Sequence, residues 1–157
     1  MIEALVEALR TASDVAPLDS ETWGRAPGAK AVRAAAAANL ALGVRRRRSV
    51  LGASVTRREV ARALGKSEQA VSAMLERGAL LGLKEGREWR IPTWQLAPDR
   101  PTGLLPGLRE MSRAYRDGVV SLSGWVDRPN PDLDGATPRQ ALSRDLVNEV
   151  VAAAAAE

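Results

Sequence analysis

The chain has 157 residues and a formal net charge of +4, and it contains no cysteine and no histidine. Their absence excludes disulfides, cysteine-based metal sites and histidine-dependent catalysis, so we expect no enzyme, no cofactor and no metal centre. No stretch is apolar enough to span a membrane and no signal peptide is evident, which favours a cytoplasmic protein. With no Phe and one Tyr, the core must be built from Leu, Val, Ala and four Trp.

Residues 1–53 are expected to form a helical amino-terminal segment. An apolar stripe of Ile2, Leu5, Val6 and Leu9 predicts a first helix. After an irregular break, a second helix is expected at about 29–42. It is rich in alanine, and its larger apolar residues are Val32, Leu40 and Leu42. Alanine favours helix but buries little surface, so this helix should pack closely, either as a support for the next domain or against a second copy. We expect a homodimer, because such small units gain stability by sharing a core.

Positive charge is concentrated in the middle of the chain. Residues 43–94 hold twelve Lys and Arg against five Asp and Glu, a net of +7, whereas the flanking segments 1–42 and 95–157 carry −1 and −2. A local excess of this kind is typical of nucleic-acid binding. Its densest part is Arg45, Arg46, Arg47 and Arg48. A charge run is usually a solvated face, but beside a DNA-binding motif it favours phosphate anchoring without sequence specificity.

Residues 56–77 predict a helix, a glycine turn and a second helix. Thr56 and Glu59 have the spacing of a capping box, Gly65 can take the left-handed conformation that ends a helix, and Ser67 can cap the next one. Apolar residues four apart give each helix one face to bury, namely Val60 with Leu64 and Val71 with Leu75. The pattern indicates a DNA-binding helix-turn-helix, with an ordinary helical hairpin as the alternative. Glu68, Gln69 and Ser72 are then expected to point outward, where a recognition helix reaches base edges.

A β-hairpin is expected directly after this pair. Two strand-like runs, 80–84 and 88–91, flank Glu85-Gly86-Arg87, and Pro92 ends the second run because it has no amide to donate. A hairpin in this position predicts a wing, so residues 54–97 are expected to be a winged helix-turn-helix domain. Trp89 and Trp94 could face DNA, but we favour a role in locking the wing onto its helices.

Three basic residues of the hairpin, Lys84, Arg87 and Arg90, are expected at or near the tip of the wing, where they would contact phosphates or the minor groove. Together, the predicted DNA-contacting residues are Arg45, Arg46, Arg47, Arg48, Thr56, Arg57, Lys66, Ser67, Glu68, Gln69, Ser72, Lys84, Arg87 and Arg90.

Residues 98–107 have the composition of a linker, with three prolines and two glycines. A small helical domain is expected at 108–157. Its first helix should run from Leu108 to about Arg116 and end at Gly118. Further along, Pro129-Asn130-Pro131 forces an extended or turning backbone.

Two more helices are expected after this turn. Thr137, Pro138 and Gln140 predict a capped helix start. Asp145 can cap the last helix, whose apolar side consists of Leu146, Val147, Val150 and Val151. From the residues alone this domain could be a dimerisation or packing appendage with one rigid loop.

The segment Trp125 to Leu142 resembles the toxin-binding domain of Xre/MbcA/ParS antitoxins. It shares the pattern Trp-x-x-x-Pro-Asn-Pro-x-Leu-x-Gly-x-x-Pro-x-x-x-Leu. The Pro-Gly-Leu at 106–108 is similar to members whose DNA-binding part is winged and excisionase-like. The resemblance covers about 55–157. Members of this family usually carry a second glycine where this chain has Asp134.

The resemblance implies a partner, a RES-domain toxin that consumes NAD. It also implies that the partner-binding loop is shaped by Trp125, Asn130, Pro131, Leu133, Gly135 and Pro138. Read from the residues alone, most of these are structural. Trp125 is expected in the core, and Asn130 is the best candidate for a functional polar group, although it could bond only its own turn.

The sequence therefore predicts a mainly α-helical protein with a winged helix-turn-helix, a short β-hairpin and a small carboxy-terminal helical domain. We expect a nucleoid-associated antitoxin that binds double-stranded DNA, neutralises a co-encoded toxin and represses its own promoter as a homodimer. The alternative is a stand-alone transcription regulator or an excisionase-like architectural protein, whose carboxy-terminal domain serves only dimerisation.

Overall fold

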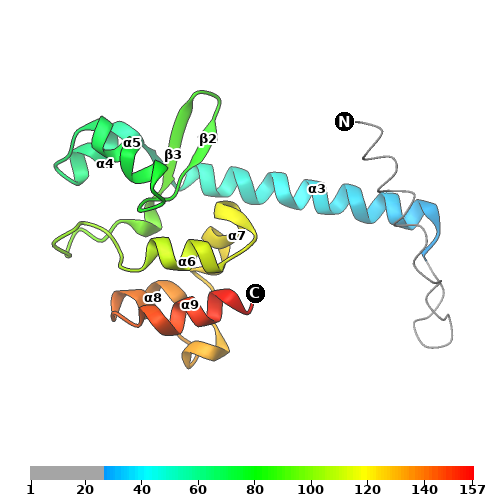
Figure 1. Ribbon diagram of the computed structural model, residues 1–157. Coiled ribbons are helices and arrows are strands. Elements are labelled where there is room, and N and C mark those ends of the chain that lie inside the picture. Colours follow the sequence, from blue (N-terminus) through cyan, green and yellow to red (C-terminus); the bar gives the residue numbers. More distant parts are fainter. Residues whose placement is uncertain (1–26) are drawn as a thin grey trace. The chain divides into compact units, whose positions relative to one another are not determined.

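A computed structural model describes residues 27–157 (Figure 1). This part of the chain is mainly helical with one three-stranded antiparallel sheet, which confirms the expected fold class. By internal contacts the chain divides into two units, residues 1–40 and 41–157. The predicted helix with Ile2, Leu5, Val6 and Leu9 lies outside the described residues. Among those that are described, no helix is long and apolar enough to cross a membrane.

The first half of the described chain holds one long helix, two short ones and the sheet. These elements are α3 (Ala29–Gly52), β1 (Ser54–Thr56), α4 (Arg57–Ala63), α5 (Glu68–Glu76), β2 (Leu83–Glu85), β3 (Glu88–Pro92) and the 3-10 turn η2 (Thr93–Gln95). The rest is helical: α6 (Leu108–Ala114), α7 (Gly118–Trp125), the 3-10 turn η3 (Pro131–Leu133), α8 (Pro138–Ser143) and α9 (Val147–Ala155).

Helix α3 continues about ten residues beyond the end expected at Leu42. Arginine is a good helix former, so the run Arg45–Arg48 extends the alanine-rich helix instead of following it. None of its 24 residues is buried. Val32, Leu40, Leu42 and Val44 are exposed apolar residues, and Leu40 is 71% exposed.

The helix-turn-helix forms as predicted from local signals. Thr56 and Glu59 make both hydrogen bonds of the capping box at the start of α4. Gly65 has φ +60°, the left-handed conformation that lets the chain leave α4. Ser67 Oγ accepts from the Ala70 amide at 3.1 Å and so caps α5. The inward residues Val60 and Val71 are fully buried.

The sheet contains one strand more than the predicted hairpin. β2 and β3 form the wing, with Leu83 opposite Arg90 and Lys84 opposite Trp89. β1 adds to the other side of β3, with Val55 opposite Ile91, so the order is β1-β3-β2. β1 has only three residues, too few to show an alternating pattern in the sequence.

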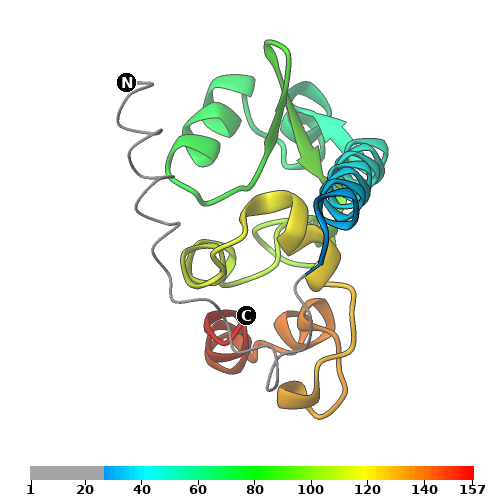
Figure 2. The same cartoon turned by 90° about the vertical axis from the view of Figure 1, so that its right-hand side faces the viewer.

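One hydrophobic core runs through unit 41–157. In both views α6 and α7 lie between the helix-turn-helix with its sheet and the pair α8–α9 (Figure 1, Figure 2). Buried apolar side chains reach this core both from the helix-turn-helix with its sheet and from helices α6 to α9. They include Val60, Val71, Leu80, Ile91, Met111, Leu122, Trp125, Leu142 and Val150. Full burial of such a side chain contributes roughly 1.5–3 kcal/mol.

The segment 98–107, expected as a linker, is largely exposed up to residue 102, but its second half packs into this core. Leu104 and Leu105 are buried, and the Leu105 amide donates to the Gln95 carbonyl at 3.0 Å. Gly107, at φ +70°, brings the start of α6 so close to Val147 of α9 that a Cβ would clash. The boundaries predicted at 53/54 and 97/98 stay predictions, but hydrophobic contact is continuous across 97/98.

Two expectations for the carboxy-terminal helices are wrong. Gly118 does not simply end a helix over 108–116: α6 already ends at Ala114, and Gly118 is the first residue of α7, which was not predicted. Asp145 does not cap α9. It has φ +62°, and its carboxylate pairs with Arg100 at 2.8 Å instead. Thr137, Pro138 and Gln140 do form the predicted capped start of α8.

Candidate nucleic-acid interface

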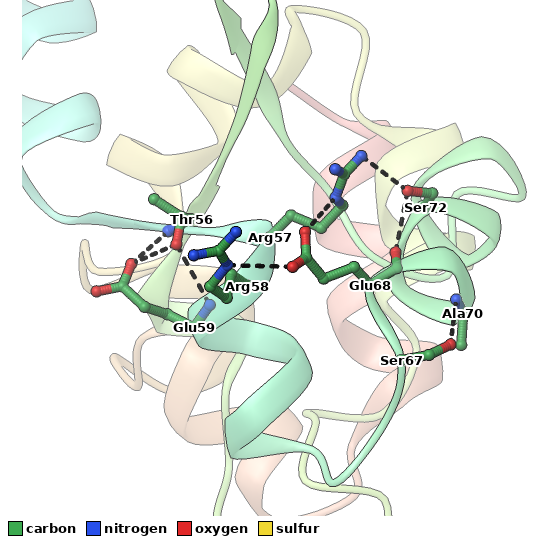
Figure 3. Close-up of polar contacts among 8 residues, drawn as sticks. All are labelled: Thr56, Arg57, Arg58, Glu59, Ser67, Glu68, Ala70 and Ser72. Carbon is green, nitrogen blue, oxygen red and sulfur yellow. Dashed lines mark hydrogen bonds and ion pairs between the residues drawn. The ribbon is translucent and has the colours of Figure 1, made fainter.

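The start of α5 is tied to the start of α4 by one carboxylate (Figure 3). Glu68 Oε2 accepts from Arg57 Nε at 3.3 Å, and Glu68 Oε1 accepts from Arg58 Nε at 3.2 Å. Arg57 also donates to Ser72 Oγ at 3.1 Å, and that hydroxyl donates to the Glu68 carbonyl at 3.0 Å. The four residues therefore form a connected network, which we call the Glu68 network.

This network corrects the expectation that Glu68 and Ser72 point freely outward. Both are half-buried, and their oxygens already bind arginine. The sequence could not show this, because the pairs join residues 10 to 15 positions apart and depend on how α4 crosses α5.

Both carboxylates at the helix starts are held in their ionised form. The hydrogen bond from Arg58 lowers the pKa of Glu68 below its ordinary value of 4.5, with a smaller effect of Arg57. The Thr56 backbone amide likewise lowers the pKa of Glu59. At neutral pH Glu68 thus carries a full negative charge between the guanidinium groups of Arg57 and Arg58.

The remaining predicted residues at the start of α5 are accessible. Lys66, Ser67 and Gln69 are exposed. Within residues 27–157, the Gln69 side chain makes no hydrogen bond, so its amide is available to both a donor and an acceptor. A glutamine in this state can pair with the N6 and N7 edge of adenine.

A cleft of about 470 Å³ separates the helix-turn-helix from the wing. Thr56, Arg57, Arg58 and Glu68 line one side, and Arg87, Glu88 and Trp89 line the other. Three guanidinium groups against two carboxylates leave the cleft with a positive charge, which suits a phosphate group.

The wing cations differ in availability. Arg87 is exposed in the turn next to Gly86, and Lys84 is exposed with its ammonium 5.2 Å from the centre of the Trp89 ring. Arg90 is not a tip residue. It lies within the sheet, donates to the Ser54 carbonyl at 3.2 Å and is 3.6 Å from Glu85.

The two tryptophans of this domain also differ. Trp94 is 5% exposed, and its indole donates to Ser123 Oγ at 3.0 Å, so it is a core residue as expected. Trp89 is half-buried beside Lys84 and packs close to Gly82.

The arginine run does not form one phosphate-binding patch. Consecutive residues of a helix point about 100° apart, so four in succession face different directions. Arg47 donates to the Lys84 carbonyl at 2.6 Å and thereby fixes the wing to α3. Arg48 lines a hollow beside Glu85 and Arg90, while Arg46 lines a different cleft with Thr93 and Trp94. Arg47 also lines the hollow of Arg48, and all four arginines are exposed, so their role as phosphate anchors stays a prediction.

Two candidate contacts, Arg58 and Arg62, were missed. Arg62 is exposed on α4, one turn after Arg58, and both line a shallow hollow with Lys66. The i, i+4 spacing of the two arginines was the available signal.

The predicted partner-binding residues separate into a buried scaffold and an exposed tip. Trp125, Asn130, Leu133 and Pro138 are buried, whereas Pro131 and Gly135 are exposed. Trp125 is 2% exposed, lies 5.4 Å from the Tyr115 ring and donates to Glu157 at 2.7 Å. Trp125 is therefore a core residue, as the residues alone suggested.

Asn130 bonds its own turn. Its side-chain oxygen accepts from the Asp132 amide at 2.8 Å, and its carbonyl accepts from the Gly135 amide at 3.0 Å. The backbone amide of Asn130 donates to the Ala136 carbonyl at 3.0 Å, and this bond closes the loop. Asp134 has φ +54°, a conformation that glycine adopts more easily. The accessible groups of the loop are thus Pro131, Asp132, Asp134 and Gly135.

The described residues contain no group of acidic side chains that could hold a metal ion. Comparison of the chain with protein-family models, with curated proteins and with solved structures finds no match. The functional interpretation therefore depends on the geometry of unit 41–157 and on the sequence resemblance.

Proposed function

We propose that the protein is a DNA-binding antitoxin that represses its own promoter as a homodimer. The observation that carries DNA binding is the exposed start of α5. Gln69 is exposed there together with Lys66, and the preceding residue, Glu68, lines a cleft with Arg57, Arg58 and Arg87 of the wing. A recognition helix uses its amino-terminal residues in the major groove, while arginines beside it hold phosphates.

Glu68 has a specific role in this proposal. Its carboxylate neutralises two arginines that could otherwise bind any phosphate, and the same ion pairs hold Arg57 over Ser72. Glu68 is therefore a positioning residue, which reduces sequence-independent affinity while it keeps Arg57 in place.

Replacing Glu68 tests this role. In Glu68→Gln, Arg57 and Arg58 lose their counter-charge, so affinity for non-specific duplex DNA should rise severalfold. The slope of log K against log salt should steepen by about 0.9 for each arginine that gains a phosphate. The matched control is Glu76→Gln, which changes the net charge equally at an exposed position of α5 without an ion pair among residues 27–157. Fluorescence anisotropy over a salt series measures both quantities.

Two failures are distinguishable in this experiment. If neither the wild-type chain nor either variant binds duplex DNA in a salt-dependent way, the DNA-binding function is wrong. If the wild-type chain binds but the two variants behave alike, DNA binding stands and the role of Glu68 is wrong.

The homodimer is supported by the exposed apolar residues of α3. Leu40 and Val44 lie one turn apart on a helix that buries no residue. We expect the chain to sediment as a dimer at micromolar concentration and Leu40→Glu to shift it to the monomer. Ala38→Glu is the control, because residue 38 lies about 200° around the helix from residue 40. A monomeric wild-type chain, or equal effects of the two variants, would contradict a dimer through this face.

The antitoxin part is supported by the resemblance and by the shape of the loop at 129–137. Its buried scaffold is held by Asn130, so little ordering entropy is lost when a partner binds the tip. The tip carries Asp132 and Asp134, which suit the basic, phosphate-binding cleft of an enzyme that consumes NAD.

Co-expression with the neighbouring reading frame tests the antitoxin part. We expect a toxic neighbour that the wild-type chain neutralises and that Asp132→Asn/Asp134→Asn neutralises poorly, because the tip loses its charge. Asparagine is tolerated in the left-handed conformation of residue 134, so the loop should keep its shape. Asp99→Asn/Asp117→Asn, with equal charge change at exposed positions elsewhere, should act like wild type. If the product of the neighbouring reading frame is not toxic, the antitoxin function is wrong and the alternative, a stand-alone transcription regulator, remains.

A further inference from the structure

A second polar cleft lies on a part of unit 41–157 that the proposed function does not use. It has a volume of about 450 Å³, which is within the range of small-molecule sites. Its walls come from separate segments: the last turns of α3, the end of β3 with η2, helix α7, and residues 127, 128 and 139.

Three arginines converge on this cleft. Arg46 reaches it from α3, Arg128 from the turn after α7, and Arg139 from α8. Only one of them has an acidic partner in the described part of the chain, because Arg139 lies 3.6 Å from Asp127. Three guanidinium groups and one carboxylate give the lining a net charge of +2. Like charges around one hollow repel each other unless an anion lies between them.

The floor of the cleft is apolar. Val50, Pro92, Trp94 and Val120 contribute to it, and the two that come from β3 and η2 are buried. The neighbouring hydroxyls are already engaged: Ser123 Oγ binds the Trp94 indole, and Ser121 Oγ pairs with the Tyr115 hydroxyl at 2.9 Å. Recognition therefore depends on the arginines for charge and on the floor for apolar contact.

We propose that this cleft binds a small organic anion, a phosphate monoester or a dicarboxylate with an apolar group. The charge of the lining matches a dianion, and guanidinium groups pair with phosphate and carboxylate oxygens in a bidentate way. The apolar group would lie on the floor beside Trp94. Such a ligand would bridge α3 and α7, because Arg46 and Val50 of α3 and Val120 and Gly124 of α7 all line the cleft.

Calorimetric titration of the full chain tests the site with defined probes. Phenyl phosphate should bind with one site per chain, inorganic phosphate more weakly, and phenol not measurably. Phthalate serves as the dicarboxylate probe. Whichever of phthalate and phenyl phosphate binds more tightly identifies the anionic group that the cleft prefers. Arg46→Ala and Arg128→Ala should each weaken phenyl phosphate binding by about tenfold or more, as expected for lost hydrogen bonds to a charged group. Arg116→Ala, an exposed arginine outside the cleft, should bind like wild type.

A second kind of variant tests whether the ligand binds in this cleft, and it does so without removing a charge. Gly124 lines the cleft from α7, and a Cβ added there meets no atom within 4 Å. Gly124→Leu should therefore fold, with higher helix propensity, and should abolish phenyl phosphate binding by filling the cleft. The proposal is wrong if wild type binds no probe, if phenol binds as well as phenyl phosphate, or if a folded Gly124→Leu binds normally. None of these results depends on DNA binding.

Discussion

The buried side-chain amide of Gln95 joins the parts of unit 41–157 on which the candidate interface depends. Gln95 is fully buried, and its Oε1 accepts from the Leu81 amide at 2.7 Å. Its Nε2 donates to the carbonyls of Leu81 at 2.8 Å and Pro92 at 3.2 Å. The Gln95 carbonyl in turn accepts from the Leu105 amide. One residue thus connects the segment after α5, the end of the wing and the segment that leads to α6.

The position of the wing follows from this arrangement. Leu81 lies between α5 and β2, so its two bonds to Gln95 fix where the hairpin starts relative to α5. Arg47 fixes the other side of the wing through the Lys84 carbonyl. The cleft lined by Arg57, Arg58 and Arg87 depends on these attachments and on the pairing of β1 with β3, which hold the hairpin beside α4. Its use as a phosphate site remains part of our proposal.

The sequence predicted those features whose causes lie within four or five residues. Thr56 with Glu59, Ser67, and Thr137 with Gln140 cap helices because their partners are three residues away. The two strand-like runs on either side of Glu85-Gly86-Arg87 were enough to predict the β-hairpin. Helix α7 was missed because its short run has no polar face and starts at a glycine, which reads as a stop signal.

Contacts between distant residues could not be predicted. The arginine bonds of the Glu68 network, the bond from Arg47 to Lys84 and the bonds between Gln95 and Leu81 join positions 10 to 37 residues apart. These contacts decide which predicted site residues are available. They leave Gln69 and Arg87 accessible, while they occupy Glu68, Ser72, Arg47 and Arg90. The placement of the arginine run was missed for the same reason, because it depends on α3 extending through the run.

The most direct test is the free energy of unfolding of Gln95→Met, measured by urea denaturation. Methionine keeps the size and flexibility of glutamine but leaves the Leu81 amide and two carbonyls buried without partners. At about 1–3 kcal/mol for each unpaired group, we expect a loss of about 3 kcal/mol or more. Gln69→Met, at an exposed position of α5, should change stability by no more than about 0.5 kcal/mol. Equal stability of the two variants would contradict the claim that Gln95 holds the wing and the two halves of the core together.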